Sequence, residues 1–172
     1  MRRIQPLLAA AAVLAVTVLV VAGVAAQDPD LTPVEQLGKA IFDDETLSIN
    51  GNQSCASCHG RAAGWTGPLS DTNLQGAVYE GSIPGAFGDR KPPSAAYATQ
   101  SPVLSVDRKG LFVGGNFWDG RATGEILRNP AAEQAKGPFL NPKEQALTDS
   151  ACVVYRVFMA TYPVSVEEVW EI

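Results

Sequence analysis

The stretch that most constrains this chain is Cys55-Ala56-Ser57-Cys58-His59, in which two thiols stand three residues apart and an imidazole follows the second. Thiols at this spacing can reach the two vinyl groups of one porphyrin, and the adjacent imidazole then falls beneath the iron. C-x-x-C-H is therefore typical of covalent c-type haem attachment. The pattern predicts Cys55 and Cys58 as thioether anchors. It predicts His59, the only histidine of the chain, as the axial iron ligand.

Three other uses of the two thiols stay open. A thioredoxin-like redox pair needs a strand before it and a helix after it, and the polar segment 47–53 does not look like a buried strand. Zinc needs two further ligands, and with no second histidine the chain offers only a third, Cys152. In an exported protein the pair can also form a disulfide. The adjacent histidine favours haem over all three.

The N-terminal segment predicts export. Arg2 and Arg3 precede an apolar run from Leu7 to Ala26, and small residues stand where a signal peptidase would cut, before Gln27. Residues 1–26 thus resemble a secretory signal peptide, which places the protein in the periplasm. A run of about 20 residues is also long enough for an N-terminal anchor, the one membrane association that we consider. The net charge of −5 and the lack of a basic patch argue against nucleic acid as a partner.

The rest of the sequence predicts a mainly α domain with long irregular loops around one covalent haem. Helices are expected from an N-cap at Thr32, over 130–135 and over 142–161. The segment 64–102 is rich in Gly, Pro, Ser and Asn, and a loop of this length is expected to wrap a large group. Four residues are expected on the inward face of the 142–161 helix: Leu147, Ala151, Val154 and Phe158.

A capping box at Ser165 opens one more predicted helix shortly before the sequence ends. We therefore expect the sequence to be a fragment of a longer protein. The expected organisation is a signal peptide or anchor at 1–26, a linker and helix start at 27–36, a haem domain at 37–163 and the start of a further C-terminal part at 164–172.

Four blocks occur in the order seen in bacterial di-haem cytochrome c peroxidases: LGKAIFDDETLSINGNQSCASCHG, DRKPPSAAYA, FWDGRATG and EQAKGPFLNPKEQ. The chain resembles that family, and the related di-haem enzymes of methylamine utilisation, over 37–145. The resemblance implies two cytochrome c-like domains with one haem c each. The first haem reacts with peroxide, and the second receives electrons from a small redox protein, a cytochrome c or a copper protein. With a single motif, the chain is expected to be the N-terminal, peroxidatic half, which reduces hydrogen peroxide to water.

The resemblance also implies three catalytic residues. Trp118 in FWDGR matches the tryptophan between the haems, Gln134 in EQAKGP the distal glutamine, and Glu144 in NPKEQ the distal glutamate. Peroxide cleavage needs a group that removes a proton and then returns it. A partly buried carboxylate with a raised pKa can do both near neutral pH. Without the resemblance, the favoured interpretation of Glu144 would be an exposed acid in the first helical turn after Pro142.

The chain departs from the family pattern at several positions. The loop after the haem motif holds no histidine, so the iron is expected to need no reductive activation. Lys91 stands near the position of an asparagine of the family's calcium site, which argues against calcium. The interval between Trp118 and Gln134 is longer than in the usual form. Arg121 is expected either to bind a haem propionate or to form a surface ion pair.

The alternative function is that of a single-haem electron carrier without catalytic activity. Met159 is the only methionine beyond the leader and could be the sixth iron ligand of such a carrier. The plainer reading of Met159 is core packing, because Val154 and Phe158 precede it in an apolar helical segment.

Overall fold

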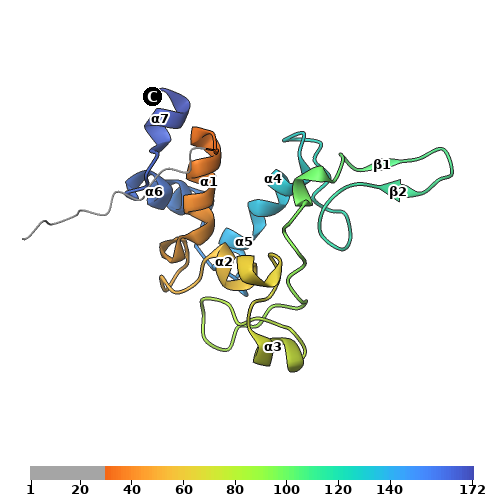
Figure 1. The fold of residues 1–172 in the computed structure, drawn as a ribbon, viewed down its shortest axis with the longest axis horizontal. Coiled ribbons are helices and arrows are strands. Elements are labelled where there is room, and N and C mark those ends of the chain that lie inside the picture. Colours follow the sequence, from red (N-terminus) through yellow and green to blue (C-terminus); the bar gives the residue numbers. More distant parts are fainter. Residues whose placement is uncertain (1–29) are drawn as a thin grey trace, which may run out of the picture.

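The computed structural model describes residues 30–172, so the predicted signal peptide or anchor lies outside the described residues. The described chain is mainly helical with one two-stranded sheet, which confirms the predicted class. Figure 1 shows α1, α6 and α7 at one end, α2, α5 and α4 in the middle, and a strand hairpin projecting from the other end. The helices are α1 (Pro33–Asp43), α2 (Cys55–Cys58), α3 (Ser70–Leu74), α4 (Pro130–Ala135), α5 (Gly137–Leu140), α6 (Ser150–Met159) and α7 (Val166–Trp170), with single 3-10 turns η1 (Glu45–Leu47), η2 (Arg61–Ala63) and η3 (Ala98–Gln100).

Helix α1 begins where the sequence predicts. Pro33 stands at the first helical position, where no backbone N–H is needed. The carboxylate of Glu35 reaches back and accepts a hydrogen bond from the Thr32 backbone N–H at 2.8 Å. Leu37 points into the core and is 2 % exposed, and α1 contacts both α2 and α7. The first helix thus supports the segment that carries the two thiols.

The predicted helix over 142–161 is wrong over 142–149, because α6 begins only at Ser150. The chain before it folds back on itself: the Ala146 N–H donates to the Asn141 carbonyl at 3.1 Å, and Ala146 has a φ of 59°. Asp149 then caps α6 by accepting from the Cys152 N–H at 2.8 Å. Side chains of Asn and Asp compete with helical backbone bonding, so they favour turns and caps here over one continuous helix.

The predicted inward face is wrong within α6, where Ala151 is exposed, Val154 is 67 % exposed and Phe158 is 48 % exposed. Of the four predicted residues, Leu147, which precedes α6, is buried. The side of α6 that meets the rest of the chain carries Arg156, whose Nη1 donates to the carbonyls of Thr46 at 2.6 Å and Ser48 at 2.9 Å. An apolar stripe at helical spacing therefore did not decide the packing, because two backbone carbonyls of the η1 turn bind the arginine.

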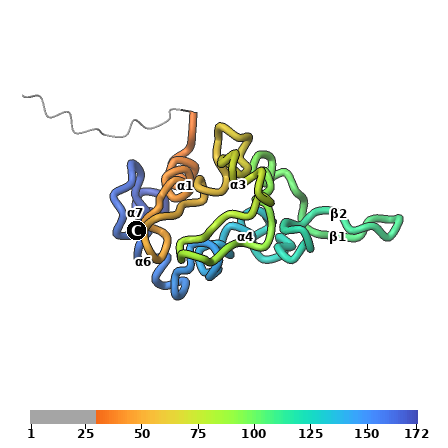
Figure 2. Tube along the Cα trace, turned by 90° about the horizontal axis from the view of Figure 1, so that it is seen from below, coloured from red at the N-terminus to blue at the C-terminus, as the bar shows by residue number. Residues whose placement is uncertain are grey.

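The segment 64–102 is mostly irregular, as predicted, and winds across the molecule as a long trace (Figure 2). The sequence analysis missed two short elements in it, α3 and η3. Tyr79 organises the first part of this loop from within: its side chain is buried, and its hydroxyl accepts from the Leu69 N–H at 2.8 Å.

The hairpin of β1 (Ser105–Val106) and β2 (Phe112–Val113) was not predicted, because its aromatic and glycine-rich surroundings indicate turns. The strands are antiparallel, with Ser105 opposite Val113 and Val106 opposite Phe112. In both Figure 1 and Figure 2 the hairpin projects away from the helices. It therefore contributes little to the packed body of the domain.

The extra residues between Trp118 and Gln134 form a loop that Glu133 holds in place. Its Oε1 accepts from the N–H groups of Ile126 at 2.8 Å and Leu127 at 3.0 Å, and its Oε2 accepts from the Gly124 N–H at 2.7 Å. These backbone donors, the Leu127 N–H first among them, lower the pKa of the Glu133 carboxyl.

Ser165 caps α7 as predicted, by accepting from the Glu168 N–H at 3.1 Å. No helix within 30–172 has the length and apolar character that crossing a membrane requires.

The hydrophobic core of the described residues is small. The buried hydrophobic side chains are Leu37, Leu47, Tyr79, Ala122, Leu147 and Val164.

Leu47, the last residue of η1, is fully buried, at 0 % exposure. We expect Leu47→Ala to lower the free energy of unfolding by about 2–5 kcal/mol, because the truncation removes apolar contacts and leaves a cavity. Urea unfolding of the purified variant measures this change. Leu74→Ala is the matched control, since Leu74 is 85 % exposed, and it should change stability by no more than about 0.5 kcal/mol. Equal effects of the two variants would contradict the assigned core.

Candidate functional site

Helix α2 is a single turn that begins at Cys55 and ends at Cys58. Residues three apart in a helix share one face, so one turn suffices to present both thiols on the same side. Ser54 precedes the turn, and its backbone N–H donates to the Ser57 hydroxyl at 3.0 Å. His59 follows directly, with its backbone N–H bonded to the Cys55 carbonyl at 2.9 Å. The two thiols and the imidazole therefore come from one helical turn and the residue that follows it.

The imidazole of His59 is held through one of its two nitrogens. Nδ1 lies 3.2 Å from the Trp65 backbone carbonyl oxygen. A carbonyl only accepts, so this contact assigns the ring proton to Nδ1 and leaves Nε2 free as a ligand atom. The same carbonyl also accepts from the Ala95 N–H at 2.9 Å, which fixes its direction.

A tight turn brings Trp65 back to His59, and it needs a glycine at position 60. The Gly60 N–H donates to the Thr66 carbonyl at 2.9 Å, which closes the turn. A Cβ on Gly60 would lie only 2.5 Å from the Pro68 Cβ. Any other residue would therefore push the turn away from the imidazole.

The two thiols are free and half-buried. Burial, with a smaller contribution from the Glu144 carboxylate, raises the pKa of each thiol to about 11. A redox-active pair needs a thiolate at neutral pH, so these protonated thiols argue against the thioredoxin-like alternative. Within 30–172 no three His, Cys, Asp or Glu side chains gather as they would to hold a metal ion.

Glu144 lies on the turn between α5 and α6, and its carboxyl is partly buried. Asn141 orients it: the Nδ2 group donates to Glu144 Oε1 at 2.8 Å, and the Asn141 Oδ1 accepts from the Lys143 N–H at 3.0 Å. Burial raises the pKa of the Glu144 carboxyl. The Asn141 hydrogen bond and the charges of His59 and Arg121 lower this pKa, but burial outweighs them.

These electrostatic interactions put Glu144 in the same region as the C-x-x-C-H motif, although about 85 residues separate them in the sequence. The Glu144 carboxylate raises the pKa of both thiols, and the charge of His59 lowers the pKa of the Glu144 carboxyl. The structure therefore brings together four of the residues singled out by the sequence: Cys55, Cys58, His59 and Glu144.

The other predicted catalytic residues lie outside this group. Trp118 is 71 % exposed, and the Arg90 guanidinium stacks on its ring at 4.2 Å from the ring centroid. Gln134 is half-buried on α4, and no hydrogen bond of the described residues joins its side chain to Glu144. Neither contact pattern assigns a chemical role by itself.

Arg121 forms the ion pair that was one of its two predicted roles. Its Nη1 lies 2.9 Å from the Asp119 carboxylate, and its guanidinium stacks over the Phe117 ring at 3.7 Å. Met159, at the end of α6, is 61 % exposed, so the prediction that it packs in the core is wrong. Lys91 is exposed at the surface.

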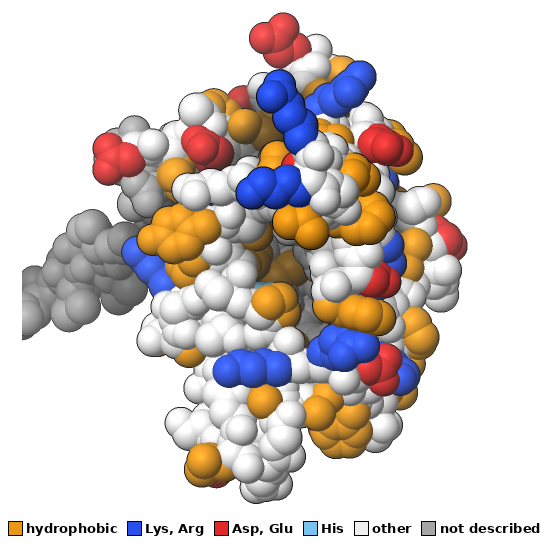
Figure 3. All heavy atoms as spheres, turned by 90° about the vertical axis from the view of Figure 1, so that its right-hand side faces the viewer, with side chains coloured by type: hydrophobic (Ala, Val, Ile, Leu, Met, Phe, Trp, Pro, Cys, Tyr) orange, Lys and Arg blue, Asp and Glu red, His pale blue; other side chains and the backbone are white. Residues whose placement is uncertain are grey.

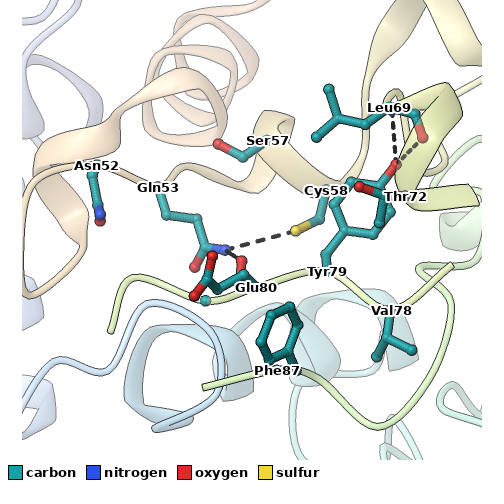
Figure 4. Close-up of a pocket in the computed structure, with 11 residues that line it drawn as sticks. Asn52, Gln53, Ser57, Cys58, Leu69, Thr72, Val78, Tyr79, Glu80 and Phe87 are labelled. Carbon is teal, nitrogen blue, oxygen red and sulfur yellow. Dashed lines mark hydrogen bonds between the residues drawn. The ribbon is translucent and has the colours of Figure 1, made fainter. Parts of the chain in front are cut away.

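A cavity of about 270 Å³ opens beside α2, on the flank of Cys58. Figure 4 shows the Gln53 amide, which lines the cavity, donating to the Cys58 sulfur at 3.8 Å; the same amide donates to the Glu80 carbonyl at 2.9 Å. Val78 and Phe87 contribute apolar walls. Neither His59 nor Glu144 lines this cavity, so it lies beside the main site.

The chemistry of these residues fits haem c. Two buried polar side chains flank the site with atoms that have no partner in 30–172, namely Gln53 Oε1 and both amide atoms of Gln145. Buried polar groups normally find partners, so such atoms indicate contacts with a bound group or water. The face in Figure 3 is hollowed at its centre, with hydrophobic side chains in the hollow and Lys and Arg side chains around it. Such a surface suits a flat apolar ring with acidic edge groups.

The sequence analysis missed several residues that position the site. Asn141 had a local signal, because Asn before Pro and three residues before an acid is typical of a side-chain cap. The Trp65 carbonyl and the Gln53 amide had none, since their contacts depend on turns that bring distant residues together.

The family model described as di-haem cytochrome c peroxidase matches residues 33–171. The methylamine utilization protein MauG of Paracoccus denitrificans is 40 % identical over 121 residues, which cover 70 % of this chain and 30 % of that protein. The cytochrome c551 peroxidase of Nitrosomonas europaea is 32 % identical over 120 residues, 70 % of this chain and 28 % of that protein.

Among solved structures, the diheme peroxidase BthA from Burkholderia thailandensis superimposes with a TM-score of 0.65 at 34 % sequence identity. The match covers 78 % of this chain and 31 % of that one. The chain thus spans less than a third of the length of these relatives. The fold is that of the cytochrome c-like domains of diheme peroxidases.

The raised pKa of Glu144 makes the stability of the fold depend on pH. The folded state binds the carboxyl proton more tightly than the unfolded chain, so the contribution is fully present at low pH and is lost as pH rises through the folded pKa. We expect Glu144→Gln to raise the thermal unfolding midpoint above wild type at pH 7–8, with the difference vanishing below about pH 4. The exposed Glu125→Gln is the control. A pH-independent difference between Glu144→Gln and wild type would contradict the burial of this carboxyl.

Proposed function

This chain belongs to the di-haem cytochrome c peroxidase family, and from that premise we propose that it forms the peroxide-reacting haem domain of an enzyme that reduces hydrogen peroxide to water. One observation carries the proposal: the partly buried Glu144 carboxyl lies within electrostatic reach of His59 and both thiols. A carboxyl in that place, whose pKa burial raises, is the acid–base group that peroxide cleavage requires.

Haem c would be held by Cys55, Cys58 and His59, and it would supply the redox chemistry for the two-electron reduction of peroxide. The residues of the chain supply the protons and the orientation. Hydrogen peroxide, two electrons and two protons give two molecules of water. The electrons come from a small redox protein, a cytochrome c or a copper protein, through a second haem in a further domain.

Glu144 moves the proton. Asn141 binds Oε1 at 2.8 Å, and Oε2 makes no hydrogen bond to the residues of 30–172, so Oε2 is the atom available to substrate. It takes a proton from one peroxide oxygen and returns it to the other as that oxygen departs. Gln134 orients the peroxide through its amide.

Trp118 is proposed as the electron route. Its ring is exposed and stacked by Arg90, which suits a position at a contact with another domain or protein. The haem domain of 37–163 would then be the N-terminal half of the enzyme. With Lys91 in the place of a calcium ligand, no calcium is assigned. The predicted leader supports a periplasmic location.

The proposal is tested by Glu144→Gln in the haem-loaded protein. Loss of the acid–base group should lower the second-order rate of reaction with hydrogen peroxide by about 10²–10⁴-fold, the usual worth of such a group. Stopped-flow absorption of the haem measures this rate. Glu125→Gln, at an exposed carboxylate, should leave it unchanged. A wild-type rate in Glu144→Gln would end the assignment, and reduced protein that resists carbon monoxide would favour the single-haem electron carrier.

Asn141→Ala separates the orientation of Glu144 from its presence. The Asn141 hydrogen bond lowers the pKa of Glu144, so its loss raises that pKa. Because the base must be ionised, we expect the acid limb of the pH–rate profile to move to higher pH. Gln75→Ala removes an exposed amide and is the control. A limb that stays at the wild-type pH would show that another group controls the profile.

A further inference from the structure

The segment that carries Glu144 is packed against Gly81 and Ser82, from a loop about 60 residues earlier. The Ser82 N–H donates to the Glu144 carbonyl at 2.7 Å. A Cβ on Gly81 would lie only 2.4 Å from the Lys143 carbonyl oxygen and 2.9 Å from the Glu144 backbone nitrogen. Both are backbone atoms that cannot swing aside. Gly81 is therefore required for space.

Ser82 connects this contact to the turn that precedes the two thiols. Its side chain is fully buried, and its hydroxyl donates to Asn52 Oδ1 at 2.6 Å and accepts from the Asn50 N–H at 3.1 Å. Its carbonyl accepts from the side-chain amides of Asn50 at 2.8 Å and Asn52 at 3.2 Å. One buried serine thus binds the turn through both its side chain and its backbone.

The same turn holds the Glu144 segment from a second point. The Ile49 N–H donates to the Gln145 carbonyl at 2.8 Å. The buried Ser48 hydroxyl accepts from the N–H groups of Asn52 and Gln53, each at 3.0 Å, which leads the chain into α2. The acid and the haem-attachment helix are therefore mounted on one hydrogen-bonded scaffold.

We propose that Gly81 and Ser82 are positioning residues that set the distance between the Glu144 carboxyl and the haem-attachment motif. This inference rests on the proposed role of Glu144 as acid–base group. Gly81 lets the two backbones approach, and Ser82 locks the approach to the turn at Asn50 and Asn52. A misplacement of about 1 Å can cost an enzyme about 100-fold in rate. Substitutions here should therefore act on the reaction without touching substrate.

The test compares Gly81→Ala and Ser82→Ala with Gly38→Ala in the haem-loaded protein. Gly38 is the matched control, because a Cβ there meets nothing within 4 Å. We expect Gly81→Ala to lower the rate with hydrogen peroxide by about 10–100-fold and Ser82→Ala to lower it by a smaller factor. Gly38→Ala should keep the wild-type rate.

Two further readouts separate positioning from general loss of structure. The charged and titratable groups that act on Glu144 are His59, Arg121 and the two thiols. Displacement of Glu144 toward solvent reduces its burial, so the acid limb of the pH–rate profile should move to lower pH in Gly81→Ala. Hydrogen exchange, followed by mass spectrometry, should become faster in peptides that contain Ser82 and Gln145 and stay unchanged in α7.

Each outcome decides the proposal. If Gly81→Ala and Ser82→Ala both keep the wild-type rate, pH limb and exchange, the proposal is overturned. If Gly81→Ala does not fold, Ser82→Ala alone decides, since it keeps the backbone N–H and removes only the hydroxyl. If Glu144→Gln itself reacts at the wild-type rate, the proposed function fails. Faster exchange at Ser82 and Gln145 would then still show that the scaffold holds the segment, without a catalytic consequence.

Discussion

The candidate site depends on the hydrogen bonds that the turn at residues 48–53 makes. The Ser48 hydroxyl accepts hydrogen bonds from the backbone N–H groups of Asn52 and Gln53 within the turn. The Ser48 backbone carbonyl accepts from Arg156 of α6 at 2.9 Å. The turn also holds Ser82 and Gln145, which come from two distant parts of the chain. Leaving any of these buried polar groups without its partner would cost about 1–3 kcal/mol. The network thus selects one arrangement of three segments that share little apolar surface.

Hydrogen bonds fix the arrangement of these segments because the described residues bury few large hydrophobic side chains. Several large ones are exposed instead, among them Tyr97 at 78 % and Phe112 at 78 %. Apolar burial is non-directional and drives collapse without fixing distances, whereas a hydrogen bond fixes both distance and angle. A site that must hold a carboxyl close to a C-x-x-C-H motif needs fixed distances. The Asn141 amide and the Ser82 backbone supply them on two sides of Glu144.

Local signals in the sequence predicted the elements whose ends are set by neighbouring residues. Thr32 with Pro33 and Ser165 with Glu168 cap α1 and α7 at the predicted positions. The prediction failed in the long helix over 142–161 because the apolar spacing continues across a turn that Asn141 stabilises. It failed again for the face of α6, where Arg156 forms hydrogen bonds with a distant turn and the apolar stripe stays partly exposed.

The sequence by itself determined the cofactor chemistry, because C-x-x-C-H needs only one helical turn to present two thiols and an imidazole. It also pointed to Glu144, through the order of four motifs. Only the tertiary structure decided that Glu144 shares a region with His59, that burial raises its pKa, and that Gly81 and Ser82 hold its segment. The physical reason is that these contacts join backbone groups between distant segments. Backbone groups are nearly the same in every residue, so no side-chain pattern predicts which of them will form hydrogen bonds with each other.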